Sequence, residues 1–349
     1  MRLSINKIGI TGALLLALLL SSCSGMLYTS IDVLRPAKVT FPADANDILI
    51  INHTRPQPHN HGHTIELFNE NVKKINIDTD SLPVFTVASL ARSISDKGFF
   101  RSVLFDHVSI NQNDYFFTPT TPDEATIKSL AQKHRVNGII SLNRIMVTDQ
   151  VAELFNQDKG TFIAFLEARY ETQWSIHFPA KNQTFQVINK DTVYWESESN
   201  TRQKAFRGLP ERRNALIDGA LITGEKAVKS FIPYWEKEDR YLFTSTNKVF
   251  KSAIDSVYYR NWDAAAKLWE TIYDYGSSSM KAKTAHNLAV ANEFLGNIGK
   301  AYQFSKKATE HLADVQVFDY TNYIRIFELH DNLRKRVAEE EKVKKQLAE

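Results

Sequence analysis

The fold is decided first by the stretch ARYETQWSIHF, which runs from Ala168 to Phe178. Apolar side chains and Thr172 occupy every second position, beginning at Ala168, whereas charged and polar side chains such as Arg169 and Glu171 occupy the positions between them. Successive side chains of a strand point to opposite faces of a sheet, so the alternation is typical of a strand with one buried and one exposed face. We therefore expect an antiparallel strand here.

The residues before this strand alternate between strand and helix patterns. Ile48 to Ile51 is a continuous apolar run, typical of a strand buried on both faces. Thr121 to Glu124 has the pattern of a capping box with Thr121 as the N-cap of a helix. The other expected elements are a helix over 81–96, strands over 100–108 and 139–147, and one or two strands over 184–195. This order predicts a mixed-sheet α/β (α+β) domain over residues 47–200, followed by a connecting helix over residues 201–235.

A second pattern decides the C-terminal part of the chain. Residues 260–269 (RNWDAAAKLW) match residues 296–305 (GNIGKAYQFS) at an offset of 36 residues. Small residues fall at corresponding positions, Ala265 with Ala301 and Ala253 with Ala289. The two segments resemble tetratricopeptide repeats, in which two antiparallel helices cross through small residues. We expect an all-α tetratricopeptide-like domain over residues 236–333, with a generic helical bundle as the alternative.

The first copy departs from the repeat pattern, because Arg260 replaces the glycine of the turn and Ile272 replaces the last alanine. Two copies are fewer than a solenoid needs, so helices over 215–235 and 320–333 are expected to cap the ends. The resemblance implies a concave groove that holds a peptide or a partner helix. The residues that the repeat register assigns to this groove are Asn247, Phe250, Ile254, His286, Val290 and Glu293.

The first residues of the chain have the pattern of a secretory signal. Arg2 and Lys7 precede an apolar run over residues 8–20, which is too short to span a membrane. The run ends in LSSC, whose last residue, Cys23, is the single cysteine of the chain. This ending resembles the lipobox of bacterial lipoproteins, in which the signal is removed and the cysteine is acylated. An ordinary signal with a chance cysteine is the alternative.

The lipobox resemblance implies that residues 1–22 are cleaved and that residues 23–46 form a lipid-anchored tether. Ser24 stands where retention at the inner membrane typically requires Asp, and residues 26–31 carry no acidic cluster that would direct the protein to the cell surface. These features favour an outer-membrane lipoprotein that faces the periplasm. Several acyl chains on one cysteine are enough for stable attachment to a membrane.

The composition excludes some functions. The chain has 349 residues, of which 43% are hydrophobic and 24% are charged, as expected for a globular protein with two domains. The formal net charge of +3 gives no electrostatic basis for binding nucleic acid. One cysteine cannot form an intramolecular disulfide, and acylation of Cys23 would leave no free thiol for catalysis.

Four histidines gather in one short segment, His53, His59, His61 and His63. Such a segment can bind zinc, copper or nickel, but two prolines and a glycine favour a solvated loop, so we predict no metal site.

The sequence contains no Gly-x-Ser-x-Gly, His-Glu-x-x-His or Gly-x-Gly-x-x-Gly motif, and we assign no catalytic residue and no cofactor. The charged residues 334–349 are expected to form a solvated helix or tail.

Two further resemblances concern larger parts of the chain. Residues 48–51, 95–100 and 130–140 are similar to a periplasmic α/β module, found in the curli-secretion lipoprotein, in the penicillin-binding-protein activator lipoproteins and in the amino-terminal domain of the Tol-system propeller protein. The order of lipobox, module and repeat resembles an uncharacterised family of Bacteroidota lipoproteins that is defined only as a domain of unknown function. That resemblance implies no enzymatic activity.

These features predict a non-enzymatic, membrane-anchored lipoprotein that acts as a protein-interaction or assembly scaffold in the cell envelope. Its partners would be the membrane, through the N-terminal lipid, and an envelope protein or peptide of unknown identity. The alternative is an envelope enzyme that acts on peptidoglycan, or a direct activator of one. A surface cleft in which carboxylates or histidines converge with shifted pKa values would favour this alternative.

Overall fold

The computed structural model describes residues 26–67, 71–111, 115–315 and 320–347. These residues form two compact units, and the chain passes from the first to the second and back. Residues 26–35 and 235–344 make up the helical unit, whereas residues 36–234 and 345–347 make up the mixed-sheet unit. The mixed-sheet unit is therefore inserted between two segments of the helical unit, a topology that the predicted linear order of domains did not include.

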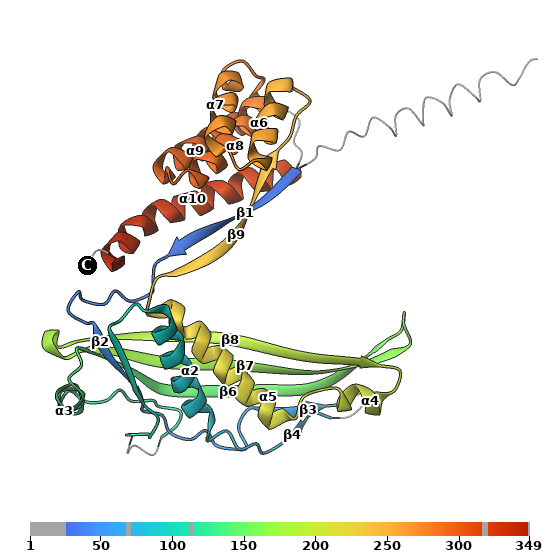
Figure 1. Ribbon diagram of the computed structural model, residues 1–349. Helices are drawn as coiled ribbons and strands as arrows, with labels where there is room; N and C mark the ends of the chain where they lie inside the picture. The colour runs from blue at the N-terminus through green and yellow to red at the C-terminus, as the bar shows by residue number, and fades with distance from the viewer. Residues whose placement is uncertain (1–25, 68–70, 112–114, 316–319, 348–349) are drawn as a thin grey trace, which may run out of the picture. The chain divides into compact units, whose positions relative to one another are not determined.

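The mixed-sheet unit is built on a seven-stranded sheet (Figure 1). Its strands are β2 (Asp47–Asn52), β3 (His63–Glu66), β4 (Lys73–Lys74), β5 (Ser102–Asp106), β6 (Gly138–Asn156), β7 (Thr161–Phe178) and β8 (Gln183–Ser199). The long strand β6 pairs in parallel with β2 and β3 along one edge and antiparallel with β7 along the other. The sheet is completed by β5 beside β2, by β4 beside β3 and by β8 beside β7.

The strand predicted from the alternating stretch is confirmed as the second half of β7. Ala168, Tyr170 and Trp174 are buried on the face that helices cover, and Arg169 is exposed on the opposite face. The alternation fails at one end of the strand, where the polar side chain of Ser175 is as fully buried as its apolar neighbours.

Two helices, α2 (Leu82–Lys97) and α5 (Arg212–Ala227), lie across one face of the sheet (Figure 1). The close approach of the two helices requires Gly224, where a β-carbon would overlap the carbonyl oxygen of Thr86. The approach of α5 to the sheet requires Gly219, where a β-carbon would overlap the Tyr170 hydroxyl of β7. The short α4 (Arg202–Arg207) lies near the ends of β7 and β8, and α3 (Glu124–His134) packs on the opposite face through Ile127.

Two predictions about this unit are wrong. Residues 201–235 do not form a connecting helix, because α4 and α5 belong to the mixed-sheet unit and α5 packs against α2. The helix expected to begin at Thr121 has Asp123 as its N-cap instead, and the Asp123 carboxylate accepts a hydrogen bond from the Thr126 N–H at 2.7 Å. A carboxylate at this position also interacts favourably with the positive end of the helix dipole.

In its described residues, the helical unit combines five helices with a two-stranded sheet. The helices are α6 (Lys248–Tyr258), α7 (Trp262–Tyr273), α8 (Ser278–Phe294), α9 (Ile298–Ala313) and α10 (Tyr320–Leu347). The two strands are β1 (Met26–Arg35) and β9 (Tyr234–Phe243). The predicted fold class, a mixed-sheet domain followed by an all-helical region, is confirmed.

The two strands and α10 correct three boundaries. The predicted tether over residues 23–46 contains β1, and the helical domain expected from residue 236 begins with β9. The predicted break before the charged residues 334–349 is also wrong, because α10 continues from Tyr320 through Leu347. A period of two was present in both missed strands, in which residues 27, 29, 31 and 33 and residues 236, 238, 240 and 242 lie on one face.

The helices pack as two successive antiparallel pairs, α6 with α7 and α8 with α9. The alanines that the repeat register assigned to the helix crossings, Ala253, Ala265, Ala289 and Ala301, are completely buried. The turns of the two pairs also correspond, because Arg260 and Gly296 both adopt a left-handed backbone with φ values of 57° and 77°. Between the pairs, Trp262 stacks on Phe294 with ring centroids 3.9 Å apart.

Candidate functional site

The predicted groove residues do not line an open groove. Phe250, Ile254, His286, Val290 and Glu293 are all buried. The sixth, Asn247, is the N-cap of α6, where its side-chain oxygen accepts hydrogen bonds from the backbone N–H groups of the first turn. The assignment of these residues to an exposed peptide-binding surface is therefore wrong.

The face of α8 that would form the groove is covered by β9. The side-chain amide of Asn287 donates to the carbonyl oxygen of Phe243 and accepts from its N–H, both at 2.9 Å. The preceding residue, His286, donates from Nε2 to the Tyr241 carbonyl oxygen at 3.0 Å. These contacts satisfy the backbone of β9 as a neighbouring strand would, so the chain's own strand occupies this face.

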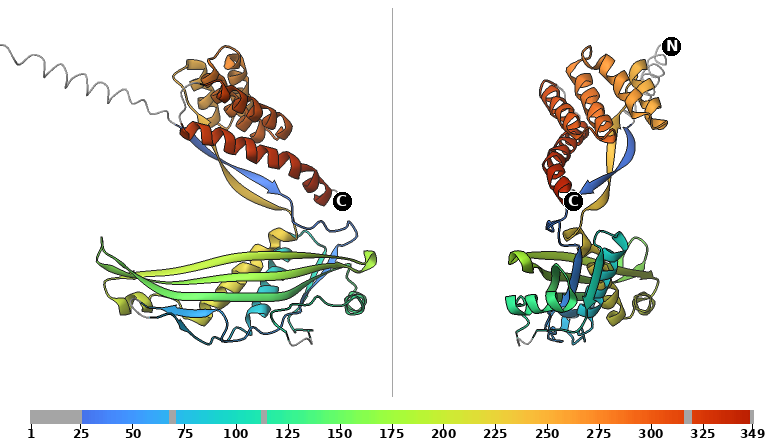
Figure 2. Two further views of the ribbon diagram at one scale, coloured as in Figure 1. Left: turned by 180° about the vertical axis from the view of Figure 1, so that it is seen from behind. Right: turned by 60° about the vertical axis from the view of Figure 1, so that its left-hand side comes forward.

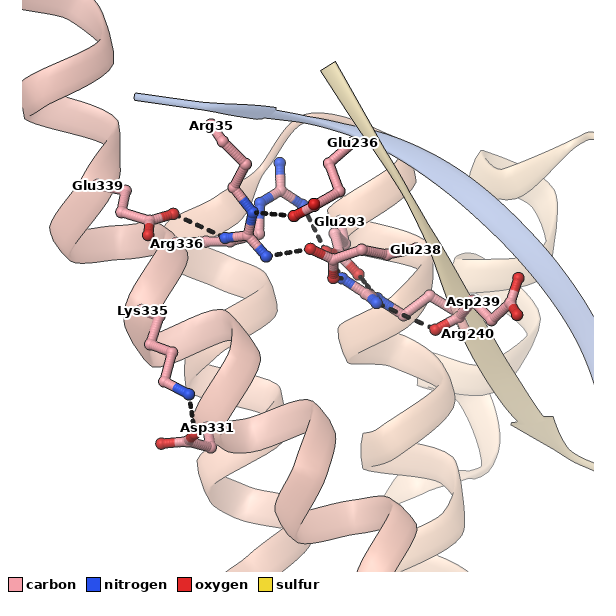
Figure 3. Close-up of polar contacts among 10 residues, drawn as sticks. All are labelled: Arg35, Glu236, Glu238, Asp239, Arg240, Glu293, Asp331, Lys335, Arg336 and Glu339. Atoms are coloured by element: carbon pink, nitrogen blue, oxygen red, sulfur yellow. Dashed lines mark hydrogen bonds and ion pairs between the residues drawn. The ribbon is translucent and has the colours of Figure 1, made fainter. Parts of the chain in front are cut away.

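A buried ion network extends from α8 into the strands (Figure 3). At its centre, the fully buried carboxylate of Glu293 accepts two hydrogen bonds from Arg240 of β9, each at 2.7 Å, and a third from Arg336 of α10. Arg240 also donates to Glu238 at 2.7 Å. Burial alone would lower the pKa of Arg240, but its two glutamate partners outweigh burial and raise that pKa.

The network continues to β1 and returns to α10. Arg35 contacts Glu238, donates to Glu339 at 2.7 Å and lies 3.5 Å from Glu236. Burial tends to raise the pKa of Glu238, but Arg240 and Arg35 on either side outweigh it and lower that pKa. The three arginines and four glutamates thus join β1, β9, α8 and α10.

Sequence reasoning identified Glu293 in this network but assigned it to a groove, and it missed the three arginines. The available signal was the alternation of Glu236, Glu238 and Arg240 on one face of a strand. Because each carboxylate at the centre already meets guanidinium groups of the same chain, the network is a structural clamp and not a ligand site.

A small cavity of about 50 Å³ lies beside the clamp, lined in part by His286, Arg325 and Glu328. It is large enough for water. Burial lowers the pKa of His286 to about 4, and Nδ1 of its ring has no partner among the described residues. The ring is therefore neutral at neutral pH, with its proton on Nε2 toward the Tyr241 carbonyl oxygen.

The mixed-sheet unit has a polar cluster of a different kind. Ser175 Oγ lies 2.7 Å from His177 Nε2, and His177 Nδ1 lies 3.0 Å from Thr184 Oγ1. Asn143 Oδ1 accepts from the Ser141 hydroxyl at 2.9 Å. Burial, followed by the nearby His53, lowers the pKa of His177 to about 4.

The Ser175–His177 pair resembles the nucleophile and base of a hydrolase in distance only. Ser175 is completely buried within β7, and a hydroxyl group takes the place of the carboxylate that would orient the histidine. A cavity of about 190 Å³ is lined by His177 and Thr184 together with Glu124 and Lys128, but not by Ser175. A substrate in this cavity would not reach the serine hydroxyl.

The predicted solvated histidine loop is wrong for two of its four histidines, because His53 and His63 are buried. His63 Nδ1 contacts the buried carboxylate of Asp149, which also accepts from Arg212 Nε at 2.5 Å. The loop is held by Gln57, whose amide donates to the Val147 carbonyl oxygen at 2.7 Å. The histidines therefore do not converge on one point.

One exposed group in this region has ligand-like atoms. His59 Nε2 lies 3.2 Å from Asp80 Oδ1 and 3.9 Å from Asp78 Oδ1, so the three side chains could offer one nitrogen and two oxygens to a metal ion. Arg213 Nη2, 3.7 Å from Asp78 Oδ2, competes for one of these carboxylates. The prediction that the histidine segment holds no metal stays a prediction.

A broad face of the sheet is left without a helix. Seen from behind, β7 and β8 lie in front of α5, and no helix crosses their middle (Figure 2, left). We call this surface the open sheet face. Its outward side chains come from Phe165, Glu167, Arg169, Glu171, Ile188, Lys190, Thr192 and Tyr194.

The open sheet face exposes apolar as well as charged groups. Ile188 and Tyr194 are 52% and 49% exposed, and the Tyr194 ring stacks on Phe165 with centroids 5.8 Å apart. Beyond this face, the last residues of β6 expose Leu154 and Phe155. Exposed apolar side chains gathered on one rigid surface are typical of sites that bind other proteins.

Cys23 and the predicted signal sequence lie outside the described residues. Within the described part of the chain, no helix has both the length and the apolar character needed to cross a membrane.

Two sequence families match the chain. The profile of a domain of unknown function (DUF8603) matches residues 45–243, and that of another domain of unknown function (DUF6340) matches residues 251–333. The chain matches no curated protein sequence.

Two of the solved structures that match the chain show weak similarity. A crystal structure of an uncharacterized protein has 8% sequence identity and a TM-score of 0.24, and the match covers 56% of this chain and 97% of the other. A putative neuraminyllactose-binding hemagglutinin homolog from Helicobacter pylori has 9% identity and a TM-score of 0.23, with 56% and 89% covered. These similarities assign neither a fold nor a function to the chain.

Proposed function

This chain belongs to the family described as a domain of unknown function (DUF8603), and we propose that it is a non-enzymatic lipoprotein that binds other proteins of the cell envelope. In this proposal, Cys23 carries the lipid, and the protein is held at the periplasmic face of the outer membrane. The support for the anchor is the LSSC ending of the apolar run, with the single cysteine of the chain at its last position. No metal or cofactor is part of the proposal.

We assign the helical unit to a tetratricopeptide-like arrangement. The support is the correspondence between the two helix pairs, with buried alanines at equivalent crossings and left-handed residues at equivalent turns. Since β9 covers the face that would hold a peptide, this unit does not bind a partner through its predicted groove in our proposal.

The open sheet face is the surface that we assign to partner binding, and it is the observation that carries the proposal. Solvent-facing sheets usually carry polar side chains, whereas here Ile188 and Tyr194 are half exposed on a rigid antiparallel strand. Lys190 lies between them on the same face and Arg169 lies on the neighbouring strand, so charged and apolar contacts would alternate along this surface. Tyrosine is a frequent source of binding energy in protein interfaces.

The alternative, an enzyme acting on peptidoglycan, has less support. Its best candidate in the described residues is the Ser175–His177 pair, in which the serine is completely buried and a hydroxyl replaces the orienting carboxylate. An activator of such an enzyme would act by binding, and it falls within the proposed function.

Two measurements test the proposal. The first is membrane fractionation of Cys23→Ala, which should leave the membrane pellet and lose lipid labelling, whereas a variant that stays in the pellet would refute the anchor.

The second compares envelope proteins crosslinked to wild type and to the double variant Ile188→Ser with Tyr194→Ser. Thr192 lies between these two positions on the same face of β8, so Thr192→Ser is the matched control. A partner lost from the double variant and kept by the control supports the proposal, and the same set of partners in all three proteins would refute this surface.

A further inference from the structure

One end of the helical unit gathers the start of β1 and the start of α10. Figure 1 and both views of Figure 2 place the first residues of β1 beside the first turn of α10. The side chains hold this arrangement, because the Arg325 guanidinium lies 3.3 Å from the centroid of the Tyr241 ring. Tyr241 in turn packs edge-on against Tyr28 with centroids 4.6 Å apart.

The length of chain before β1 places this end close to the proposed anchor. Only Ser24 and Gly25 separate Cys23 from Met26, the first residue of β1. A fully extended chain advances about 3.3–3.6 Å per residue, so Met26 lies within about 10 Å of Cys23 whatever the conformation of the two residues between them. The polar zone of one leaflet is itself about 5–8 Å thick, so a lipid on Cys23 would hold the start of β1 against the headgroups.

The exposed side chains at this end suit a headgroup layer. Tyr28 is 59% exposed and Tyr320, the first residue of α10, is 75% exposed. Tyr323 follows one turn later and is 39% exposed. Tyrosine combines an apolar ring with a hydroxyl that hydrogen-bonds to headgroups and water, and it is enriched where proteins meet the membrane interface.

We propose that Tyr28, Tyr320 and Tyr323 form a membrane-contact surface that lies against the phospholipid headgroups of the membrane that anchors Cys23. This inference rests on the proposed lipidation of Cys23. If the inference is right, the helical unit is the part of the protein held at the membrane. This unit contains most of the C-terminal half of the chain, although the anchor is at the N-terminus. The occupant of the surface is the lipid itself and not a protein partner.

The experiment fixes the anchor chemically, so that it does not depend on processing in the cell. The chain beginning at Cys23 is coupled through its single thiol to a maleimide-bearing phospholipid in vesicles of phosphatidylethanolamine and phosphatidylglycerol. A photoreactive p-benzoylphenylalanine replaces Tyr320 in one protein and Lys344 in the other. Lys344 is exposed on the same helix, 24 residues further on, which is about 36 Å along the axis.

After irradiation, mass spectrometry measures the phospholipid adduct at each position. We expect the adduct at position 320 to exceed that at position 344 by about tenfold, because the headgroup layer is much thinner than the separation of the two sites. Equal adducts, or more adduct at position 344, would overturn the inference. Crosslinks between two copies of the protein at position 320, in place of lipid adducts, would also overturn it and assign the surface to self-association.

The two proposals fail separately. If Cys23→Ala stays in the membrane pellet of cells while the coupled protein gives the expected lipid adducts, the lipoprotein assignment is wrong and the contact surface stands as a property of the fold. If Cys23→Ala is released and the adducts are equal, the anchor stands and the contact surface is refuted.

Discussion

The clamp of the helical unit and the cluster around His177 in the mixed-sheet unit bury polar groups in opposite ways. The helical unit buries charge, since Glu293, Arg240 and Arg336 meet in its interior and continue to Arg35. The mixed-sheet unit buries neutral groups around His177, where hydroxyl and amide side chains contact one another. The stability of the clamp therefore depends on every charged partner being present, whereas the stability of the cluster around His177 depends on that histidine remaining uncharged.

The difference follows from what each cluster has to join. The clamp joins β1 and β9 to α8 and α10, and β1 is separated from the rest of its unit by the whole mixed-sheet insertion. Long arginine side chains reach across such elements and satisfy carboxylates in two-point contacts. The cluster around His177 lies on adjacent strands, so short side chains reach one another directly.

The largest expected effect comes from breaking the clamp at its centre. Glu293→Ala leaves Arg240 and Arg336 without their shared carboxylate in a buried site, which typically costs about 3–5 kcal/mol. Hydrogen exchange measured by mass spectrometry should show faster exchange in α8 and β9, while β6 and β7 keep their protection. As a control, Glu270→Ala removes exposed charge interactions with Lys300 and Lys267 and should change the stability by less than about 1 kcal/mol. Unchanged protection in Glu293→Ala would show that the clamp contributes little.

The second prediction concerns the pH dependence of the mixed-sheet unit. The pKa of His177 is about 4 in the folded unit, below its usual value near 6.5 in an unfolded chain. The unfolded state therefore binds the proton first as the pH falls, and stability that is present above pH 6.5 is lost between pH 6.5 and pH 4. The loss attributable to this group is about 3 kcal/mol.

His177→Gln should flatten this dependence, because glutamine does not titrate. Urea unfolding followed by exchange in β7 at several pH values measures the effect, and His107→Gln, at an exposed position, should leave the slope unchanged. A wild-type unit equally stable at pH 7 and pH 4.5 would contradict the prediction.

The sequence predicted the elements that local patterns specify and missed those that depend on distant contacts. β7 was predicted because its alternation sets an apolar face against a helix layer, and the helix pairs were predicted because alanines recur at fixed spacing. β1 and β9 alternate as well, but their buried faces contain Arg35, Glu238 and Arg240, which sequence reasoning takes for solvent-exposed residues. Their partners on the two strands and on α8 and α10 make these charges tolerable in the interior.

The same reason explains the fate of the predicted site. Phe250, His286 and Glu293 were assigned to a groove on the assumption that the repeat stands alone, and β9 covers that face instead. The open sheet face was not predicted, although Ile188 and Tyr194 are the outward apolar residues of a strand that the sequence did indicate. The pattern of one strand does not specify whether a helix covers it.

A third prediction sharpens the comparison within the helical unit. Ala301 is completely buried in the packing of α9. Leucine at this position overpacks the contact, at a typical cost of about 1–3 kcal/mol. Ala301→Leu should lower the thermal midpoint of the helical unit in the full chain and leave the mixed-sheet unit unaffected.

The control for this variant lies on the exposed side of the same helix. Lys306→Gln removes a weak contact with Glu310, at 3.9 Å, and should leave the thermal midpoint nearly unchanged. A thermal midpoint of Ala301→Leu equal to or above that of wild type would contradict the assigned repeat register.

The smallest expected effect distinguishes the two helix pairs from each other. Their turns place Arg260 and Gly296 at equivalent positions, both with positive φ. A residue with a β-carbon is strained in this conformation by about 1–2 kcal/mol, and glycine is not. The Arg260 side chain is exposed, and no contact of the fold depends on it among the described residues. Arg260→Gly should therefore stabilise the first pair by about 1 kcal/mol after the greater freedom of glycine in the unfolded chain is subtracted.

The reverse change at the second turn completes the test. No atom lies within 4 Å of a β-carbon placed on Gly296, so Gly296→Ala introduces backbone strain without a steric overlap. It should destabilise the unit by about 1 kcal/mol. Thermal unfolding of the full chain, with exchange in α7 and α9 to identify the affected pair, measures both changes. If Arg260→Gly destabilises the unit while Gly296→Ala also does so, Arg260 contributes more by its side chain than it costs by its backbone, and the two turns are equivalent in geometry but not in energy.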